Sequence, residues 1–485
     1  MQRTILLILL ASLLFCACTP QETGKTTTSP SLTLSDCVLQ VSARAEIKAR
    51  CGSLDVPEDR GNPQGRQISL NLVVIPAVKK NPAPDPLFLL AGGPGQSAVE
   101  TYPPMLALFY KIHESRDLVL LDQRGTGKSN PLHCLDPEKD ENLDEAQALE
   151  HLQNCPGELD ADVRFYTTEI AMQDLDAVRA ALGYESVNLY GASYGTRAAL
   201  TYLRMFPARV RTIAIDAVAD PGYVMFQDAA ADGQQALDLF FARCQADPAC
   251  QETYPNLRAE FEGLLSRLEK APLTLTMPHP RTNKPLELTV TREMITGLVF
   301  NTLYSPDLVA TLPLSLHSAA AQENFIPLIS QSYMLDAGIA DGLFYAVTCT
   351  EDAPLVSVSE AAKNSRGSLF GDKTVDFLEV CTHWPKGQVS TSFRAPIVSN
   401  VPTLIFSGEA DPITPPRHAE KVAASLGNEL HLVFKGMGHA NVTNSCTANI
   451  LADFIASGLV SGLDTTCMAQ LQPPPFFVDF SGPRP

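Results

Sequence analysis

The chain has 485 residues, of which 45% are hydrophobic, and its formal net charge at pH 7 is −18. A chain of this length and composition can bury a large core and form one elaborated domain or two to three smaller units. Its negative charge repels phosphate, so we expect no nucleic acid among its partners.

The N-terminus is typical of an export signal followed by a tether. After Arg3, an apolar run begins at Ile5 and continues to Ala17, which is too short to span a bilayer comfortably. The small residue and Cys18 at its end resemble a bacterial lipoprotein signal, in which Cys18 becomes the lipidated first residue. We expect residues 1–17 to be a signal peptide and residues 18–35 a flexible tether at the cell envelope, facing the periplasm or the cell surface. Plain secretion is the alternative.

Cysteine usage agrees with export. Besides Cys16 and Cys18, ten cysteines remain, and an even set in an exported chain is typical of disulfides. Sequence leaves the connectivity open, but nearest-neighbour pairing is favoured because short loops close easily. The neighbouring pairs are Cys37/Cys51, Cys134/Cys155, Cys244/Cys250, Cys349/Cys381 and Cys446/Cys467. We expect no metal, because the chain contains no C-x-x-C pair of the zinc-binding kind.

Continuous apolar runs that end in glycine turns predict strands buried on both faces, as in a parallel sheet. Such runs or alternating strand patterns occur in residues 65–77, 85–97, 116–130, 186–195 and 210–221. Helical patterns in residues 168–184 and 196–207 lie between the later strands. The alternation of strand and helix predicts an α/β fold with a mostly parallel sheet flanked by helices.

The pattern changes to amphipathic helices between residues 222 and 390, which predicts an inserted helical cap. Strand-and-turn patterns then return in residues 401–416 and 429–442. We therefore expect a core divided between residues 36–221 and 391–485, with the cap at 222–390.

Residues 191–195 form a G-x-S-x-G pattern around Ser193, directly after a predicted strand and before a predicted helix. A nucleophile elbow has this arrangement, because glycines on both sides permit a tight turn that exposes the serine at the sheet edge. Alone, the pattern would be better explained as a turn that happens to contain a serine.

A nucleophilic serine also needs a base and an acid that orients the base. In this kind of fold they follow the serine in the order acid, then histidine. Asp411 and His439 lie in turns after the last two predicted strands and fit this order. Glu409 is the competing acid. His418 and His431 are competing bases, but we expect one on a helix face and the other inside a strand.

Acyl transfer needs hydrogen-bond donors for an oxyanion. The backbone N–H of Tyr194 is the expected first donor, because it follows the nucleophile. The glycine turn "AGGPGQS" at residues 91–97 is placed to supply the second, since Gly92 and Gly93 let the backbone approach a substrate closely. A plain Gly-Pro turn is the alternative.

Four segments carry a resemblance to a known family: "AGGPGQS", "LDQRGTGKS" (121–129), "YGASYGTR" (190–197) and "GEADPITP" (408–415). They resemble the α/β-hydrolase serine exopeptidases of the prolyl iminopeptidase and tripeptidyl aminopeptidase family. The resemblance implies an α/β-hydrolase fold with a helical cap and a serine triad that works without a cofactor. It also implies that Ser193 is the nucleophile, Asp411 the acid and His439 the base, with the Gly93 and Tyr194 amides in the oxyanion hole.

Other residues refine the resemblance. Ala91 stands where many prolyl iminopeptidases have histidine, so the chain looks closer to the exported tripeptidyl aminopeptidase branch. Asp122 and Arg124 look structural, since an Arg-Asp pair can brace loops around a site. Glu351 and Asp352 are the expected anchors for the substrate's ammonium group, and the alternative is that both lie on the solvated surface.

The leading hypothesis is a serine hydrolase that releases N-terminal residues or short peptides from a peptide substrate through an acyl-enzyme. An esterase or other hydrolase with the same triad is the alternative, because this fold hosts many chemistries. A non-catalytic envelope lipoprotein is the third hypothesis. The sequence leaves the oligomeric state open.

Overall fold

The computed structural model describes residues 32–136, 140, 143, 145–333 and 338–484. The expected signal peptide and Cys18 lie outside the described residues. The tether ends earlier than expected, because Thr33 already begins the first strand.

The strands are β1 (Thr33–Ser42), β2 (Ala45–Pro57), β3 (Gln67–Ile75), β4 (Leu87–Leu90), β5 (Leu118–Leu121), β6 (Val187–Ala192), β7 (Val210–Asp216), β8 (Leu273–Pro278), β9 (Pro285–Val290), β10 (Thr403–Gly408) and β11 (Glu429–Phe434). The helices of the first half are α1 (Ala98–Thr101), α2 (Tyr110–His113), α3 (Glu145–Asn154), α4 (Thr168–Ala181), α5 (Tyr194–Met205), α6 (Ala229–Ala246), α7 (Pro248–Thr253) and α8 (Leu257–Lys270). The remaining helices are α9 (Arg292–Thr302), α10 (Pro306–Gln322), α11 (Ile326–Ser332), α12 (Asp341–Glu351), α13 (Val358–Asn364), α14 (Thr374–His383), α15 (Pro416–Ala423) and α16 (Ser445–Ser457).

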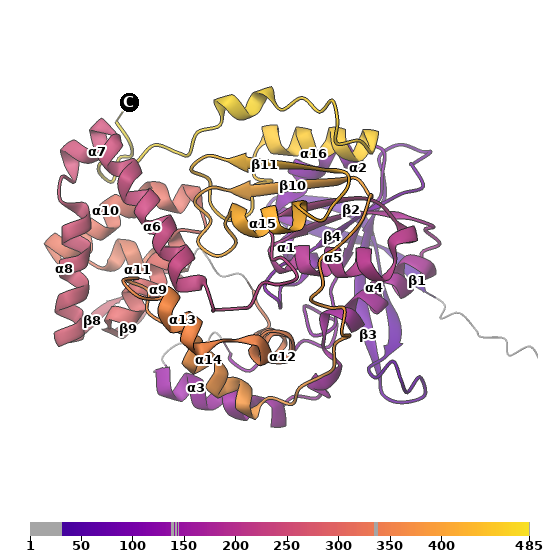
Figure 1. Cartoon of the computed structure of the whole chain (residues 1–485), viewed down its shortest axis with the longest axis horizontal. Helices are drawn as coiled ribbons and strands as arrows, with labels where there is room; N and C mark the ends of the chain where they lie inside the picture. Colours follow the sequence, from indigo (N-terminus) through magenta and orange to yellow (C-terminus); the bar gives the residue numbers. More distant parts are fainter. Residues whose placement is uncertain (1–31, 137–139, 141–142, 144, 334–337, 485) are drawn as a thin grey trace, which may run out of the picture.

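A nine-stranded sheet forms the centre of the molecule, in the order β1-β2-β3-β5-β4-β6-β7-β10-β11 (Figure 1). Strands β5, β4, β6, β7, β10 and β11 run parallel to one another, while β1, β2 and β3 pair antiparallel at one side. The parallel part places the carboxyl ends of β4, β6, β7, β10 and β11 at one edge, where the predicted site residues follow.

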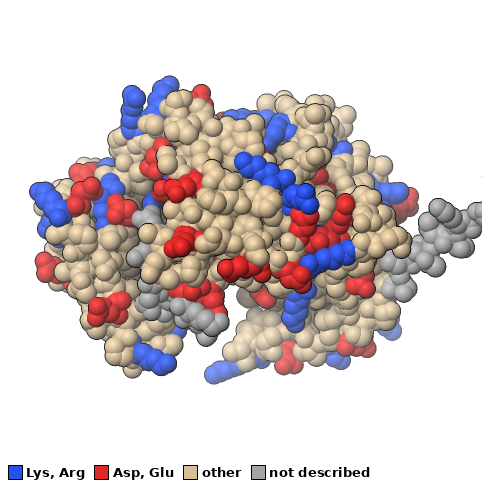
Figure 2. Space-filling view, turned by 90° about the horizontal axis from the view of Figure 1, so that it is seen from below, with Lys and Arg blue, Asp and Glu red and all other residues tan. Residues whose placement is uncertain are grey.

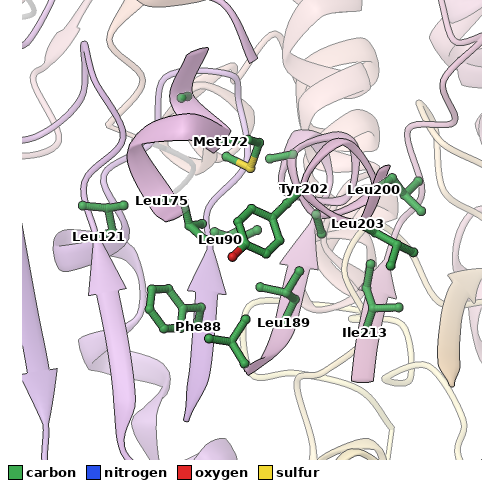
Figure 3. Packing of buried hydrophobic residues seen from close by; sticks show 14 of the residues in the cluster. Phe88, Leu90, Leu121, Met172, Leu175, Leu189, Leu200, Tyr202, Leu203 and Ile213 are labelled. Carbon is green, nitrogen blue, oxygen red and sulfur yellow. The ribbon is translucent and has the colours of Figure 1, made fainter. Parts of the chain in front are cut away.

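The central strands are apolar without alternation because helices cover both faces of the sheet. In β4, Leu87 and Leu89 face one hydrophobic cluster, whereas Phe88 and Leu90 face the other. Figure 3 shows the second cluster, where strand residues pack against Met172 and Leu175 of α4 and against residues of α5. This packing fixes the end of β6, where the G-x-S-x-G turn begins.

The cap departs from the prediction of a purely helical insertion, because β8 and β9 form an antiparallel hairpin within it. The hairpin alternates apolar and polar residues, and its buried side chains, among them Met277 and Val290, join the core of the cap. Figure 1 shows the cap in two parts, with α6–α11 and the hairpin on one side of the molecule and α12–α14 below the sheet.

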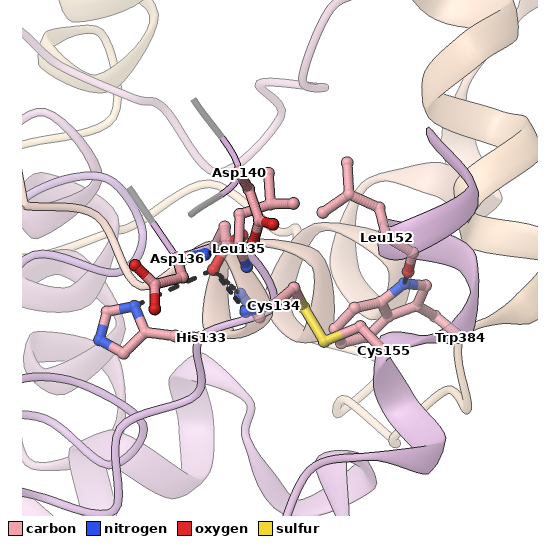
Figure 4. The surroundings of a disulfide bond; sticks show 10 residues. His133, Cys134, Leu135, Asp136, Asp140, Leu152, Cys155 and Trp384 are labelled. Carbon is pink, nitrogen blue, oxygen red and sulfur yellow. Dashed lines mark hydrogen bonds and ion pairs between the residues drawn. A yellow bond between two sulfur atoms is a disulfide. The ribbon is translucent and has the colours of Figure 1, made fainter. Parts of the chain in front are cut away.

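Part of the predicted core also belongs to the cap. Helix α3 lies beside α12 and α14 (Figure 1), and residues of its segment share a hydrophobic cluster with Trp384. Figure 4 shows the Cys134–Cys155 disulfide that closes this segment, together with the Trp384 indole N–H donating to the Leu152 carbonyl at 2.9 Å. The described residues in 131–136 and 145–157, which the division at residue 221 assigned to the core, therefore pack with the cap.

The C-terminal tail was expected to end the core, but it returns to the cap. Phe476 is buried in the core of the cap, and the guanidinium carbon of Arg243 lies 3.8 Å from the centre of its ring. The amide of Phe477 donates to the carbonyl of Ala310 at 2.9 Å. The tail therefore bridges the two parts of the fold, and its last described residues lie near α7 (Figure 1).

Five disulfides join the neighbouring cysteines: Cys37–Cys51, Cys134–Cys155, Cys244–Cys250, Cys349–Cys381 and Cys446–Cys467. These are the pairs that the spacing favoured. Each bridge closes a local loop of the core or of the cap.

The described surface carries charges of both signs. Figure 2 shows groups of acidic side chains spread over one face, with basic side chains between and beside them. Within the described residues, no helix is both long and apolar enough to cross a membrane.

Candidate active site

Ser193 occupies a sharp turn between β6 and α5. Its backbone has φ 57° and ψ −126°, and its N–H donates to the carbonyl of Asp216 at 2.9 Å. A side chain at Gly191 would collide with the carbonyl of Gly195, and one at Gly195 would collide with the carbonyl of Leu90. The two glycines of the motif are therefore required by close backbone packing, and the helix that starts at Tyr194 favours negative charge beside the serine.

The loop after β4 lies directly against this turn. A Cβ added at Gly92 would lie 3.1 Å from the Cβ of Ser193, so the glycine permits the close approach. Gly93, with φ 103°, lines the same cavity as Ser193 and Tyr194. The two residues whose backbone amides are expected to stabilise an oxyanion therefore line the same cavity as the serine.

Asp411 and His439 meet across the ends of β10 and β11. The Nδ1 atom of His439 lies 2.8 Å from Oδ2 of Asp411, whose other oxygen accepts the N–H groups of Ile413 and Thr414 at 2.9 Å each. The hydroxyl of Thr414 also donates to Asp411 Oδ2 at 2.9 Å and lies 3.2 Å from His439 Nδ1. Four groups therefore fix the acid, which is 1% exposed.

The competing residues lie elsewhere. The carboxylate of Glu409 accepts the N–H of Gly436 at 2.9 Å. His418 is buried on α15 and contacts Asp220, and His431 lies in β11 next to the hydroxyl of Ser407. The placements of both histidines on a helix face and in a strand are as the sequence predicted.

A cavity of about 590 Å³ lies between the sheet edge and the cap. Ser193 and His439 both line it, together with residues of the loop after β4. The cap contributes mainly aromatic and aliphatic side chains: Phe226, Phe300, Tyr304, Ile339, Phe344 and Phe370. The charged residues of its described lining besides His439 are Arg197, Glu293 and Lys373.

A model of the α/β hydrolase fold family matches residues 85–443, which is more than half of the chain. This chain belongs to the α/β hydrolase fold family. The match begins before β4 and ends just beyond the turn that carries His439, so it spans the sheet edge, the cap and the cavity.

Curated relatives include the serine protease Hip1 of Mycobacterium tuberculosis (strain ATCC 25618 / H37Rv), 26% identical over 466 residues that cover 86% of this chain and 87% of the relative. Carboxylesterase B of M. tuberculosis (strain CDC 1551 / Oshkosh) is 27% identical over 492 residues, covering 92% of each chain. The tripeptidyl aminopeptidase of Streptomyces lividans is 31% identical over 192 residues, covering 36% of each chain. Together with the fold, these likenesses make this chain a serine hydrolase.

Glu351 and Asp352 were expected to bind the substrate's ammonium group, but they do not lie at the cavity. Neither is among the described residues that line the cavity, and both are almost fully buried. Asp352 accepts from both terminal nitrogens of Arg197, at 3.0 and 3.1 Å, and from Arg394 at 3.0 Å. An ammonium group approaching from the cavity would first meet the guanidinium of Arg197, so the expected anchor is wrong.

Glu351 instead links the cap to the core. Its carboxylate accepts the backbone N–H of Thr168 at 2.7 Å and the Thr168 hydroxyl at 2.9 Å. The same hydroxyl lies 2.7 Å from the hydroxyl of Tyr194. Burial raises the pKa of Glu351 to about 7, although Arg197 and Thr168 oppose this shift. The exposed-surface alternative is wrong as well, because Glu351 is 2% exposed.

Arg124 is structural, but its partner is Asp174 of α4 and not Asp122. Two of its nitrogens donate to the two carboxylate oxygens of Asp174 at 2.6 and 2.8 Å. Asp122 accepts from the hydroxyl of Ser97 at 2.6 Å and from Asn71 at 2.8 Å. Asp122 thus holds the start of α1, the helix that follows the glycine turn after β4.

Sequence reasoning missed two residues at the site. Thr414 contacts both Asp411 and His439, and its position three residues after the acid is the local signal of a side chain that can fold back onto it. Glu293 lines the cavity from α9, and only the three-dimensional structure brings it there. Within the described residues, no cluster of three or more His, Cys, Asp and Glu side chains could hold a metal ion.

Activity of this hydrolase is expected to fall as the pH drops through the pKa of His439. Burial lowers that pKa, but the carboxylates of Asp411 and Asp216 outweigh burial and raise it above 6.5. The base must be neutral to accept a proton. In a plot of kcat/KM against pH, the midpoint of the fall on the acidic side (the acid limb) should therefore lie above pH 6.5. Asp411→Asn should move the midpoint down. A midpoint at or below 6.5 in the unsubstituted protein would contradict this description of the base.

Proposed function

We propose that the protein is a serine peptidase that releases a residue or a short peptide from the N-terminal end of a peptide. The observation that carries this proposal is the size and place of the site: a cavity of about 590 Å³ lies between the sheet edge and the cap, and Ser193 and His439 line it. A cavity of this size buries a ligand of a few residues, whereas an extended chain on both sides of the cut needs an open groove. The names of the Hip1 protease and tripeptidyl aminopeptidase relatives support a peptide substrate.

In the proposed reaction, Oγ of Ser193 attacks the scissile carbonyl carbon while His439 accepts the hydroxyl proton. Asp411 holds the imidazole in the tautomer with Nδ1–H and stabilises the imidazolium. The N–H groups of Gly93 and Tyr194 bind the developing oxyanion. His439 then gives the proton to the leaving amine, and water, deprotonated by His439, hydrolyses the acyl-enzyme and restores the serine.

Amide and ester substrates test this proposal against esterase activity, which the Carboxylesterase B relative favours as the second candidate. Peptidyl p-nitroanilides with a free N-terminus should be hydrolysed with a kcat/KM far above that of Nα-acetylated ones, and Ser193→Ala should remove the activity. Turnover of p-nitrophenyl esters without turnover of any free-amine anilide would favour the esterase.

Glu293 is the carboxylate in the described cavity lining, and we propose that it receives the substrate's ammonium group. Glu293→Gln removes the charge and keeps the shape, so KM for free-amine substrates should rise about 10-fold, the loss of roughly one charge-assisted hydrogen bond. Steady-state kinetics with matched Nα-acetylated substrates should show no such rise.

Glu287→Gln is the matched control, because it removes an exposed glutamate from β9, away from the cavity lining. It should leave KM unchanged for both substrates. An equal effect of Glu293→Gln on free and acetylated substrates would eliminate the ammonium anchor.

The protein is also proposed to be exported and lipid-anchored at the bacterial cell envelope through Cys18. The apolar run before Cys18 and the five disulfides support this proposal, since disulfides persist in oxidising compartments. Metabolic labelling with a clickable fatty acid should mark the protein, and Cys18→Ser should abolish the label.

A further inference from the structure

Asp216, the last residue of β7, is a buried acid for which the catalytic chemistry described above has no direct use. It is completely buried, and within the described residues no Lys, Arg or His side chain pairs with it as an ion pair. A buried carboxylate without a cation is costly, so its hydrogen bonds must compensate for the lost water.

Among the described residues, the donors to its carboxylate are the hydroxyl of Tyr190 in β6 and groups of Asn441 and Val442 in the loop after His439. Oδ2 of Asp216 accepts the backbone N–H of Asn441 at 2.6 Å, that of Val442 at 2.9 Å and the hydroxyl of Tyr190 at 3.1 Å. Oδ1 accepts the side-chain amide of Asn441 at 3.1 Å. Burial raises the pKa of Asp216, and the hydrogen bonds from Asn441, Val442 and Tyr190 oppose this shift. Since four donors point at the carboxylate, it acts only as an acceptor, as an ionised acid does.

The segment that Asp216 holds begins two residues after His439. Between them, Ala440 has φ 61°, a left-handed conformation that is unfavourable for alanine. The bonds to Asn441 and Val442 hold the loop beyond His439 in this conformation, while the N–H of His439 itself donates to the carbonyl of Tyr304 at 2.9 Å. Asp411 fixes only the rotation of the ring, through Nδ1.

The main chain of the same residue holds the nucleophile. The carbonyl of Asp216 accepts the N–H of Ser193 at 2.9 Å, and Asp216 is the register partner of Ala192 in the neighbouring strand. One residue therefore bonds to the turn of the serine through its backbone and to the loop of the histidine through its side chain.

We propose that Asp216 is a positioning residue that sets the distance between Ser193 and His439 by tying the His439 loop to the end of β7. The proposal rests on the candidate triad and not on the peptide class of the substrate. Among the described residues, the charged or titratable groups that face His439 are Asp411 from the loop after β10, Asp216 from β7 and Tyr304 from the cap. The negative charge of Asp216 adds to that of Asp411 in favouring the imidazolium.

Asp216→Ala removes every side-chain bond to the loop. Because a displacement of about 1 Å in a catalytic group can cost about 100-fold in rate, kcat on a p-nitrophenyl ester or a peptidyl anilide should fall about 100-fold. KM should stay within about 2-fold, since the cavity lining is retained. Labelling of Ser193 by a fluorophosphonate should slow in parallel, which makes this readout independent of the true substrate.

Asp216→Asn separates charge from position and serves if the alanine variant does not fold. Its carbonyl oxygen can still accept from the two backbone N–H groups, so kcat should fall less than in the alanine variant. Without the negative charge the pKa of His439 falls, and the acid limb of kcat/KM should move to lower pH. A purely structural role would leave the midpoint of that limb where it was.

Asp85→Asn is the matched control, because Asp85 is also a buried aspartate but lies at the opposite end of the strands, paired with Arg116 at 2.9 Å. It should lower the melting temperature without moving kcat or the acid limb. The proposal is overturned if Asp216→Asn leaves both kcat and the acid limb unchanged, or if folded Asp216→Ala loses no more kcat than the Asp85 variant.

Discussion

Replacing Ser193 with alanine is expected to lower kcat/KM about 10⁴- to 10⁶-fold while leaving the fold intact. In the proposed reaction the serine supplies the nucleophile, and without it His439 and Asp411 have no hydroxyl to activate, so only the binding and oxyanion contributions remain. The turn itself is held by backbone bonds and by the glycines at 191 and 195, which the substitution leaves in place. Single-turnover kinetics with an active ester and fluorophosphonate labelling measure the loss.

Ser318→Ala is the matched control for this experiment. Ser318 is a buried serine on α10 of the cap and is not among the described residues of the cavity lining. Its removal should leave kcat/KM and labelling within about 2-fold of the unsubstituted protein. Undiminished turnover in Ser193→Ala would mean that the chemistry takes place elsewhere in the molecule.

Replacing Asp174 with alanine is expected to give the largest loss of stability, about 3–5 kcal/mol in the free energy of unfolding. Asp174 forms a forked pair with Arg124, whose side chain is 1% exposed, and it also pairs with Arg60. Removing the carboxylate leaves the Arg124 charge buried, and its remaining hydrogen-bond partners among the described residues are backbone carbonyls alone. The denaturant midpoint under non-reducing conditions measures the effect.

Asp238→Ala on α6 supplies the comparison. Its ion pair with Arg258 at 2.7 Å is exposed on both sides, so its loss should cost about 1 kcal/mol or less. If both variants unfold at the same denaturant concentration, burial of the Arg124–Asp174 pair does not determine how much the pair contributes to the free energy of unfolding.

The parallel half of the sheet could be predicted because β4, β5, β6 and β10 are short, mostly apolar and followed by polar turns. That pattern has one common cause, burial of both faces, and it locates the turns of Ser193 and Asp411 in advance. By contrast, β1 and β2 are half exposed and pair antiparallel at the sheet margin, so they lack this pattern.

What sequence could not supply were contacts between distant segments. Helix α3 packs against the cap at Trp384, and the C-terminal tail packs into the cap through Phe476. No local sequence pattern indicates either contact. Likewise, Glu351 and Asp352 looked like free carboxylates because their partners, Arg197 and Arg394, lie far away in the chain. Asp216 sits in an ordinary apolar strand, and only the structure reveals that it bonds to both sides of the site.

Digestion of a defined peptide library, followed by mass spectrometry, tests the central claim most directly. The purified protein should cut within the first one to three bonds from a free N-terminus, Nα-acetylated members should be spared, and the Ser193→Ala protein should give no cuts. Internal cuts that ignore the N-terminus, or a wild-type digest identical to that of Ser193→Ala, would contradict the assignment of this hydrolase as an exopeptidase.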